Sequence, residues 1–379
     1  MQATTSKNAA SVTGTGAGVL GSRASMVAMS AAVVSTPRKQ IGFLSFGHWQ
    51  QAEWSLTPTA RDALAQTVEL AVAAEELGVD GAFVRVHHFA RQLSAPFPLL
   101  SAIGVRTSRI EIGTAVIDMR YENPLYMAED AAVADLLSGG RLQLGVSRGS
   151  PEPAYRGFDA FGYAPPEGMN DADFARMKVE LFRAAIAGAG VVHADAGGQP
   201  SPGKLPIQPQ SPGLSDRIWW GSGTRETAVW AGEQGMNLMS STLLLEDTSV
   251  PFDELQAEQI AVFRQAWAAA GHSRSPRVSV SRSVLPVTSD LDRRLFGRDA
   301  GEDQVGWLDG ALARFGRSYT GEPDVLAAEL AQDAAVAAAD TILLTVPNQL
   351  GVEYNARLLE TIVRHIAPAI GWSPAASIT

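Results

Sequence analysis

The chain has 379 residues, and its 30 basic and 40 acidic side chains give it a formal net charge of −10. Hydrophobic residues make up 46% and charged residues 18% of the sequence, which is typical of a folded globular protein. Cysteine is absent, so disulfides, thiolate nucleophiles, zinc–thiolate sites and iron–sulfur clusters are excluded. The acidic balance argues against a nucleic-acid partner. No apolar run approaches the ~18 residues of a membrane span.

The beginning of the sequence differs from the rest. Every charged residue before Glu53 is basic, in a background of alanine, serine, threonine and glycine. This stretch has no strand or helix period and few large apolar side chains, and it lacks the apolar segment of a secretory signal. Its composition loosely resembles a transit peptide. We expect residues 1–37 to be a disordered or mis-started tail, with Met26 or Met29 as the alternative start, and residues 38–379 to form one domain.

From residue 41 onward, short apolar runs alternate with stretches of helical spacing. The run at 41–46 predicts a strand, and 59–77 predicts a helix that ends at Gly78. Further strands are expected at 82–86, 110–116, 142–147, 218–220, 236–240, 278–285 and 341–346, and further helices at 97–105, 124–137, 171–186, 224–234, 252–270, 323–338 and 352–366. Strands that alternate with helices pair in parallel through right-handed crossovers. Eight such units predict an α/β fold, a closed (β/α)₈ TIM barrel, with an open doubly wound sheet as the alternative.

Two connections are longer than ordinary loops. Residues 188–216 are rich in proline and glycine, and residues 286–321 follow the seventh expected strand. Within the second connection we expect a helix at 306–315. Long loops in compact domains are usually functional, and an insertion after a barrel strand lies at the catalytic mouth. The insertion at about 286–321 is therefore predicted to be a lid.

Histidines follow the first two expected strands, where the reactive groups of such a barrel lie. His48 follows the first strand, and His87 and His88 follow the second. An imidazole can act as an acid or base near neutral pH, so His87 is the candidate catalytic residue, with a non-catalytic rim histidine as the alternative. Adjacent strand residues face opposite sides, no H-E-x-x-H motif is present and carboxylates are lacking nearby, so we expect no metal site.

A glycine-rich turn, Gly221-Ser222-Gly223-Thr224, connects an expected strand to an expected helix. Glycines allow an anion to approach the backbone, the helix N-terminus offers unpaired N–H groups, and the hydroxyls add donors. Arg148, at the end of the fourth strand, would supply a matching cation for a phosphate. The alternatives are plain N-capping by the hydroxyls and, for Arg148, a salt bridge at the rim.

The segment Gly145-Val-Ser147-Arg-Gly149 also matches the G-x-S-x-G nucleophile elbow of hydrolases. That elbow needs a helix directly after the turn, whereas Pro151 and Pro153 follow here and do not begin a regular helix. A serine hydrolase is therefore the least favoured function.

Several segments follow one another in a recognisable order. They are His87-His88-Phe89, Ser108-Arg-Ile-Glu-Ile-Gly-Thr-Ala-Val116, Asn123-Pro-Leu-Tyr-Met-Ala-Glu-Asp130 and Leu136-Leu-Ser-Gly-Gly-Arg-Leu-Gln-Leu-Gly-Val-Ser-Arg148-Gly149. Together they resemble the bacterial luciferase-like monooxygenase family of flavin-dependent enzymes. The similarity extends from about residue 41 to residue 370. The family fold is a (β/α)₈ barrel, which agrees with the count of strands and helices.

The resemblance implies that reduced FMN, supplied by a separate flavin reductase, binds at the barrel mouth. It also implies a non-proline cis peptide near residues 115–116, and it makes His87 the family's catalytic histidine. The position before the two histidines is commonly glutamate in the family but is Val86 here, so a carboxylate that would orient the imidazole is missing. The residues expected to bind the cofactor are Ala115, Val116, Ser147, Arg148, Ser222, Gly223 and Thr224.

We therefore predict an oxidoreductase, a flavin-dependent monooxygenase in which reduced FMN and O₂ give a flavin hydroperoxide that oxygenates a small hydrophobic substrate, such as an aldehyde or ketone. The alternatives are a deazaflavin-dependent oxidoreductase, which ignores O₂, and a non-catalytic flavin-binding subunit. The resemblance further implies a homodimer, and we expect a cytoplasmic location without a membrane partner. The residues expected to form the substrate pocket are Phe46, His48, Trp49, His88 and Phe89.

Overall fold

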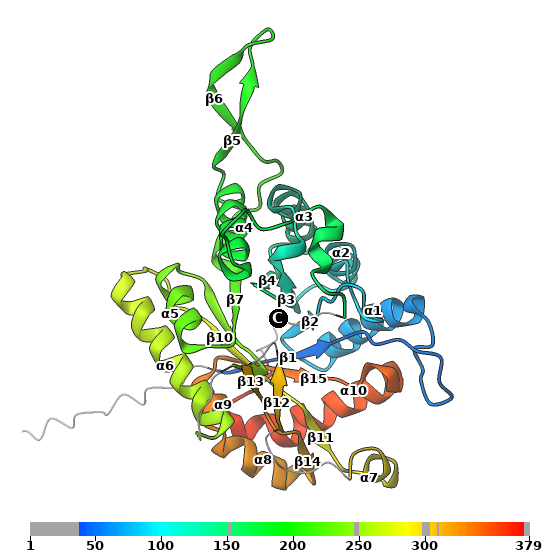
Figure 1. Cartoon of the computed structure of the whole chain (residues 1–379). Coiled ribbons are helices and arrows are strands. Elements are labelled where there is room, and N and C mark those ends of the chain that lie inside the picture. Colours follow the sequence, from blue (N-terminus) through cyan, green and yellow to red (C-terminus); the bar gives the residue numbers. More distant parts are fainter. Residues whose placement is uncertain (1–37, 150–152, 246–249, 298–303, 309–310, 375–379) are drawn as a thin grey trace, which may run out of the picture. The chain divides into compact units, whose positions relative to one another are not determined.

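The computed structural model describes residues 38–149, 153–245, 250–297, 304–308 and 311–374, so the expected tail at 1–37 lies outside the described residues. Eight parallel strands form a closed barrel in the order β1-β15-β10-β8-β7-β4-β3-β2 (Figure 1). This confirms the predicted (β/α)₈ barrel. The barrel strands are β1 (Gln40–Ser45), β2 (Gly81–Val84), β3 (Glu111–Asp118), β4 (Leu142–Ser147), β7 (Ile218–Ser222), β8 (Asn237–Ser240), β10 (Val278–Arg282) and β15 (Thr341–Thr345).

Helices connect the barrel strands and pack against them through one large apolar core. Local sequence signals set where these helices begin. Thr59 and Asp62 form a capping box at the start of α1, and Asn123 caps α3 directly before Pro124. Among the described helices, none is long and apolar enough to cross a membrane. The α-helices between barrel strands are α1 (Ala60–Glu76), α2 (Pro96–Arg106), α3 (Pro124–Leu137), α4 (Asp171–Ile186), α5 (Arg225–Glu233), α6 (Phe252–Ala270), α7 (Asp290–Phe296), α8 (Pro323–Gln332) and α9 (Ala334–Ala338), and α10 (Gly351–Thr361) follows β15.

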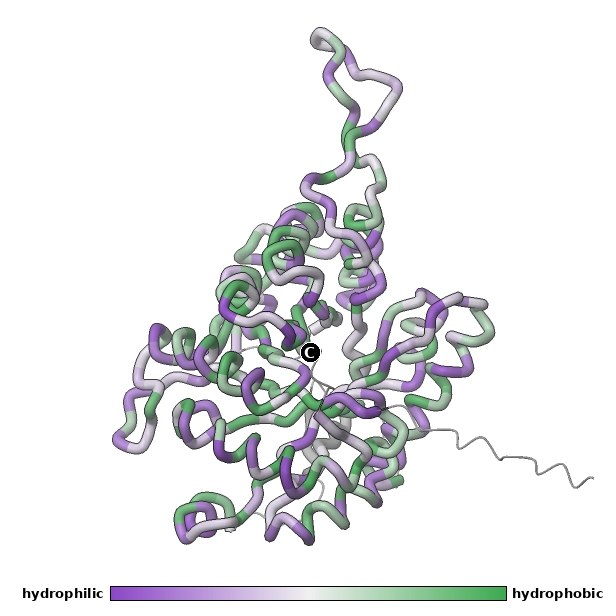
Figure 2. Tube along the Cα trace, turned by 180° about the vertical axis from the view of Figure 1, so that it is seen from behind, coloured by the Kyte–Doolittle hydropathy of each residue, from purple (hydrophilic) through white to green (hydrophobic). Residues whose placement is uncertain are grey.

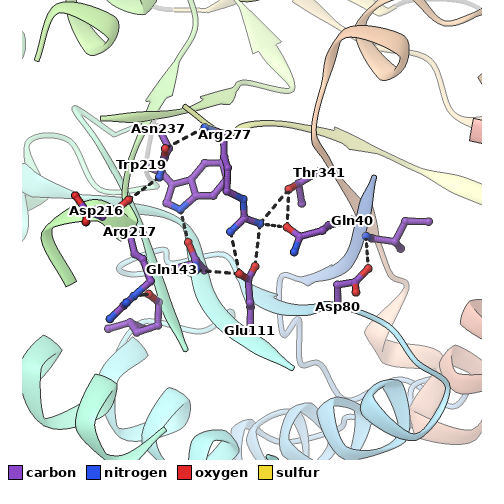
Figure 3. Close-up of polar contacts among 12 residues, drawn as sticks. Gln40, Asp80, Glu111, Gln143, Asp216, Arg217, Trp219, Asn237, Arg277 and Thr341 are labelled. Atoms are coloured by element: carbon purple, nitrogen blue, oxygen red, sulfur yellow. Dashed lines mark hydrogen bonds and ion pairs between the residues drawn. The ribbon is translucent and has the colours of Figure 1, made fainter. Parts of the chain in front are cut away.

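The barrel interior is built in layers because side chains alternate between the two faces of each strand. At the amino-terminal end, Arg277 pairs with Glu111 at 2.8 Å within a network of polar side chains (Figure 3). Above this network lies a second, apolar layer. It consists of Leu44, Phe83, Ala115, Trp219, Met239 and Leu343. The two layers occupy the amino-terminal part of the barrel, and a cavity lies toward the carboxyl ends of the strands.

The segment at 306–315 is not the expected helix. β12 (Gln304–Leu308) pairs antiparallel with β13 (Ala311–Phe315), and β13 pairs with β9 (Leu243–Leu244). The helix prediction was wrong because strand pairing between β12 and β13 and with β9, rather than local helical spacing, decides the structure of this segment. The insertion after β10 is therefore joined by strand pairing to the segment that follows β8.

The other long connection, at 188–216, contains a two-stranded hairpin. β5 (Gly190–Asp195) pairs antiparallel with β6 (Pro200–Pro206), and most of their side chains are exposed. The hairpin stands away from the barrel in both views (Figure 1, Figure 2). Pairing across this hairpin satisfies the backbone of a segment that the barrel does not cover.

A buried ion pair anchors the insertion to the barrel. Arg282, the last residue of β10, donates to both carboxylate oxygens of Asp333 at 2.7 and 2.9 Å, and both side chains are buried. The hydroxyl of Tyr319 donates to the same carboxylate at 2.6 Å. Tyr319 begins β14 (Tyr319–Gly321), which pairs with β11 (Val284–Pro286) directly after β10. The carboxylate of Asp333 therefore holds together both ends of the insertion.

We predict that Arg282→Ala lowers the free energy of unfolding by about 3–5 kcal/mol, because it leaves the buried carboxylate of Asp333 without its cation. Urea denaturation measures this loss. The matched control is Arg357→Ala, which removes the exposed pair with Glu353 and should change stability by less than about 1 kcal/mol. Equal losses in the two variants would contradict an anchoring role for Arg282.

Candidate active site

A cavity of about 490 Å³ lies at the carboxyl ends of the barrel strands. Its wall continues along the first turns of α4 and α5, where Asp173, Arg176 and Glu226 line it. The location matches the place where (β/α)₈ barrels carry their active sites. All eight strands, or the residues just after them, contribute to the wall through Leu44, Arg85, Ala115, Ser147, Gly221, Met239, Ser281 and Leu343.

The inner wall of the cavity is apolar. Leu44, Ala115, Met239 and Leu343 belong to the apolar layer of the barrel, and Val116 packs against that layer. The peptide bond between Ala115 and Val116 is cis, as the resemblance implies. An apolar wall of this kind suits a planar aromatic ring system, which gains free energy when it is buried.

Arg148 lines the cavity at the end of β4. Within the described part of the chain, no hydrogen bond or ion pair engages its guanidinium group. The rim salt bridge considered from the sequence is therefore not formed with any described residue. Ser147 also lines the cavity, and its hydroxyl accepts the backbone N–H of Gly149 at 2.8 Å. The guanidinium of Arg148 is consequently placed to bind an anion in the cavity.

Gly223 and Thr224 line the cavity where β7 leads into α5. The hydroxyl of Thr224 accepts the backbone N–H of Thr227 at 3.2 Å, so the N-capping alternative is confirmed for this side chain. The residue nevertheless stands at the cavity wall, beside the N-terminus of a helix and its partial positive charge.

Ser222 does not line the cavity. Its hydroxyl donates to the backbone oxygen of Thr224 at 2.9 Å and contacts the hydroxyl of Thr227. Side chains alternate along β7, so Gly221 faces the barrel interior and Ser222 faces the outer helices. A Cβ at Gly221 would stand 3.1 Å from a methyl group of Val116, so glycine keeps this part of the wall open. A phosphate contact through the Ser222 hydroxyl is not supported by this arrangement.

His87, the expected catalytic histidine, is not part of the cavity wall. Its Nε2 accepts a hydrogen bond from Nε of Arg85 at 3.1 Å, and Arg85 lines the cavity. The guanidinium of Arg85 also lies over the ring of Phe46, 5.6 Å from its centroid. His48 also stacks against Phe46, and its Nε2 lies 2.8 Å from Nε2 of Gln92. Burial, and to a lesser extent the charge of His87, lowers the pKa of His48.

The other residues expected in the substrate pocket also lie outside the cavity wall. His88 is buried and stacks on Tyr121 with a centroid distance of 4.1 Å. Phe89 packs edge-on against Phe161, and Trp49 lies beneath the guanidinium of Arg91. In the described residues, no group of three or more histidines and carboxylates is arranged to hold a metal ion. The aromatic residues thus pack on one another beside the cavity.

Two cavity arginines, Arg85 and Arg176, were missed from the sequence. The alternation of side chains in an extended segment could have indicated Arg85. It lies two residues before His87, and Val86 between them is buried in the outer core. Arg176 lies on α4 over the ring of Trp230, at 4.9 Å from its centroid, and Nη1 is 3.6 Å from Asp173. Helical spacing alone does not show which side of α4 meets the barrel mouth.

A partly buried charged cluster supports the start of α4 beside the cavity. Arg120 forms ion pairs of 2.7 Å with Asp118 at the end of β3 and with Asp171, the first residue of α4. Nζ of Lys178 donates to the backbone oxygens of Arg120 and Glu122 at 2.8 Å. Burial raises the pKa of Glu122 to about 7 and lowers the pKa of Lys178 to about 8.

The profile of the luciferase-like monooxygenase family matches residues 16–295, and the chain belongs to this family. It is 26% identical over 238 residues to the alkanal monooxygenase alpha chain of Photobacterium leiognathi, with 62% of each chain covered. It is also 42% identical over 88 residues to an F420-dependent glucose-6-phosphate dehydrogenase of Kribbella flavida, which is 22% of this chain and 26% of the relative. The chain spans 27%, 55% and 62% of the length of three curated relatives that it matches, which is less than two thirds in each case.

Solved structures share the fold at low sequence identity. The monooxygenase RslO1 from Streptomyces bottropensis has a TM-score of 0.66 at 21% identity, covering 87% of this chain and 99% of that one. The oxygenating constituent of 3,6-diketocamphane monooxygenase from Pseudomonas putida, in complex with FMN, has a TM-score of 0.63 at 17% identity, covering 89% and 100%. The F420-dependent tetrahydromethanopterin reductase from Methanopyrus kandleri reaches 0.57 at 15% identity, covering 88% and 99%.

We predict that Glu122→Gln makes the protein more stable than the wild type near neutral pH. A pKa raised from 4.5 to about 7 means that folding favours the protonated acid, so the free energy of unfolding falls as the pH rises from about 4.5 through 7. Each pKa unit corresponds to about 1.4 kcal/mol. Urea titrations between pH 4.5 and 8 should show the advantage of the variant growing with pH. An unchanged difference over this range would contradict the prediction, and exposed Glu353→Gln serves as the control.

Proposed function

We propose that the chain is a flavin-dependent monooxygenase that uses reduced FMN, delivered by a separate reductase, and O₂ to oxygenate a small organic substrate, with aldehydes and ketones as the favoured class. One observation carries the proposal. The cavity combines an apolar wall inside the barrel with Arg148, which has no polar partner among the described residues, and with the N-terminus of α5. A molecule that joins a planar ring to a phosphate needs both features.

The residues present fit FMN. Arg148 would pair with the phosphate, and the backbone at Gly223 and Thr224 would add donors at the start of α5. Ala115 and Val116 would support the ring from the apolar side. When it is bound, reduced FMN supplies the electrons that activate O₂. The chain itself contributes the binding energy, the orientation of the ring and the exclusion of water.

Exclusion of water depends on what covers the mouth. β13 of the insertion pairs with β9, and Leu243 of β9 lines the cavity. The insertion at about 286–321 is therefore attached to the wall of the cavity, as a lid would be. A lid that excludes water strengthens electrostatic interactions inside the site and protects reactive species from side reactions. The apolar wall formed by Leu44, Met239 and Leu343 accommodates the hydrophobic part of a substrate.

A deazaflavin-dependent oxidoreductase is the second candidate. The comparisons favour it because relatives include F420-dependent glucose-6-phosphate dehydrogenases of Kribbella flavida and Nocardia farcinica, the latter 36% identical over 131 residues. A deazaflavin would use the same apolar wall and the same cation. It would transfer a hydride and leave O₂ unused, which separates the two candidates experimentally.

We predict that the protein binds reduced FMN and that Arg148→Ala raises the dissociation constant roughly 10- to 100-fold, because the phosphate loses a charge-assisted hydrogen bond. Anaerobic titration measures binding, and stopped-flow mixing with O₂ shows whether bound flavin reoxidises with kinetics different from free FMN. Arg357→Ala, an exposed arginine on α10, is the control. Reoxidation at the rate of free FMN, together with tight F420 binding and no O₂ consumption, would favour the second candidate.

We also propose a homodimer in which α3 contributes to the interface. The helix is apolar on two sides, and one of them faces solvent in the monomer. The buried side has Met127, Ala131 and Ala134, and the exposed apolar residues are Tyr126, Val133 and Leu137. An exposed apolar face on a helix is typical of an interaction surface.

Leu137→Glu should shift the protein from dimer to monomer, because a carboxylate would be desolvated in the interface. Sedimentation velocity measures the change. Leu291→Glu places the same charge on a similarly exposed leucine of α7 (Asp290–Phe296), and it should leave the dimer intact. A monomeric wild type would exclude this interface.

A further inference from the structure

Arg85 stands between the cavity and the histidine that the family resemblance singles out. Its side chain lines the cavity, whereas His87 does not, and Nε of Arg85 donates to Nε2 of His87 at 3.1 Å. The two residues follow the end of β2 and are separated by Val86, which is buried in the outer core. On this side, Arg85 therefore forms part of the cavity wall, and His87 lies behind it in contact with its side chain.

Two of the contacts of this guanidinium restrict its orientation. The imidazole of His87 accepts from Nε, and the ring of Phe46 lies under the group with a centroid distance of 5.6 Å. His48 stacks against the same Phe46 ring, and its backbone N–H donates to Oδ1 of Asn348 at 3.0 Å. A donor that is already oriented stabilises developing charge without paying for reorganisation.

The hydrogen bond also specifies the form of the histidine. Nε2 can accept from Arg85 only when it carries no proton, so a neutral His87 in this contact has its proton on Nδ1. A guanidinium is charged near neutral pH, so it moves no proton there. The pair thus presents a permanent cation to the cavity, with the imidazole behind it.

We propose that Arg85, rather than His87, is the residue that acts on the reaction in this cavity, and that His87 is a positioning residue that orients it. The inference rests on the proposed function. Molecular oxygen gains negative charge as it takes up electrons from a reduced flavin, and each electron that the flavin loses is one that the oxygen gains. A fixed guanidinium at the wall stabilises that charge.

The first test needs no cofactor. In protein with ¹⁵N-labelled histidines, long-range ¹H–¹⁵N spectra distinguish a ring protonated on Nδ1 from one protonated on Nε2, and His87→Gln assigns the signal among the six histidines. We expect the Nδ1-protonated form in the wild type and a mixture of the two forms in Arg85→Gln. A ring of His87 protonated on Nε2 in the wild type would overturn the pairing.

The second test compares variants loaded with reduced FMN. Stopped-flow mixing with O₂ should show reoxidation of bound flavin roughly 10- to 100-fold slower in Arg85→Gln than in the wild type, with partial recovery in Arg85→Lys. His87→Gln, whose amide oxygen can accept from Arg85, should lose at least tenfold less than Arg85→Gln. The dissociation constant for FMN should stay within about threefold in all three variants, because the phosphate site is elsewhere.

The outcomes separate the two proposals. A wild type that does not bind reduced FMN refutes the proposed function, and this inference fails with it. A wild type that binds FMN normally, with Arg85→Gln reoxidising at the wild-type rate, overturns only the inference. A loss in His87→Gln equal to or larger than that in Arg85→Gln does the same, because it returns the catalytic role to the histidine.

Discussion

The ion pair between Arg277 and Glu111 closes the barrel at its amino-terminal end, and the layers above depend on it. The guanidinium spans the interior from the start of β10 to β3, and its plane lies over the ring of Trp219 (Figure 3). Hydrogen bonds extend the pair to most of the other strands, through Gln40, Gln143, Trp219, Asn237 and Thr341. A charged pair is tolerated in an interior only when its hydrogen-bonding groups find partners, and here the neighbouring strands supply them. This network and the apolar layer above it occupy the amino-terminal part of the barrel, and the cavity lies at the opposite end.

Much of this arrangement is predictable from the sequence because it depends on local patterns. The alternation of apolar runs and helical spacing predicts eight units, and the carboxyl ends of the strands predict where Arg148, Gly223 and Thr224 meet. Even the choice between inward and outward side chains follows a period of two. Gly221 faces the cavity and Ser222 does not, for that reason alone.

Other features depend on contacts between distant segments, and no local pattern encodes them. The strand β13 forms because it pairs with β9, about 70 residues earlier in the chain, so the helical spacing of 306–315 was misleading. The aromatic residues after β2 were expected to meet the ligand. His88 instead stacks on Tyr121 from the end of β3, a partner that lies more than 30 residues away. Tertiary packing decides whether an aromatic side chain at a strand end lines a cavity or fills a gap beside it.

The three arginines of the cavity wall illustrate how identical side chains acquire different roles. Arg148 has no polar partner among the described residues, so its guanidinium is available to pair with an incoming phosphate. Arg176 is placed over Trp230 near Asp173, which partly neutralises it. Arg85 is held by His87 and Phe46, so its orientation is set before any ligand arrives. An arginine that binds a charge already present on the ligand can be mobile. An arginine that stabilises a charge formed only during the reaction must be oriented beforehand. The contacts of Arg85 meet the second requirement, and family membership alone would have directed attention to the histidine beside it.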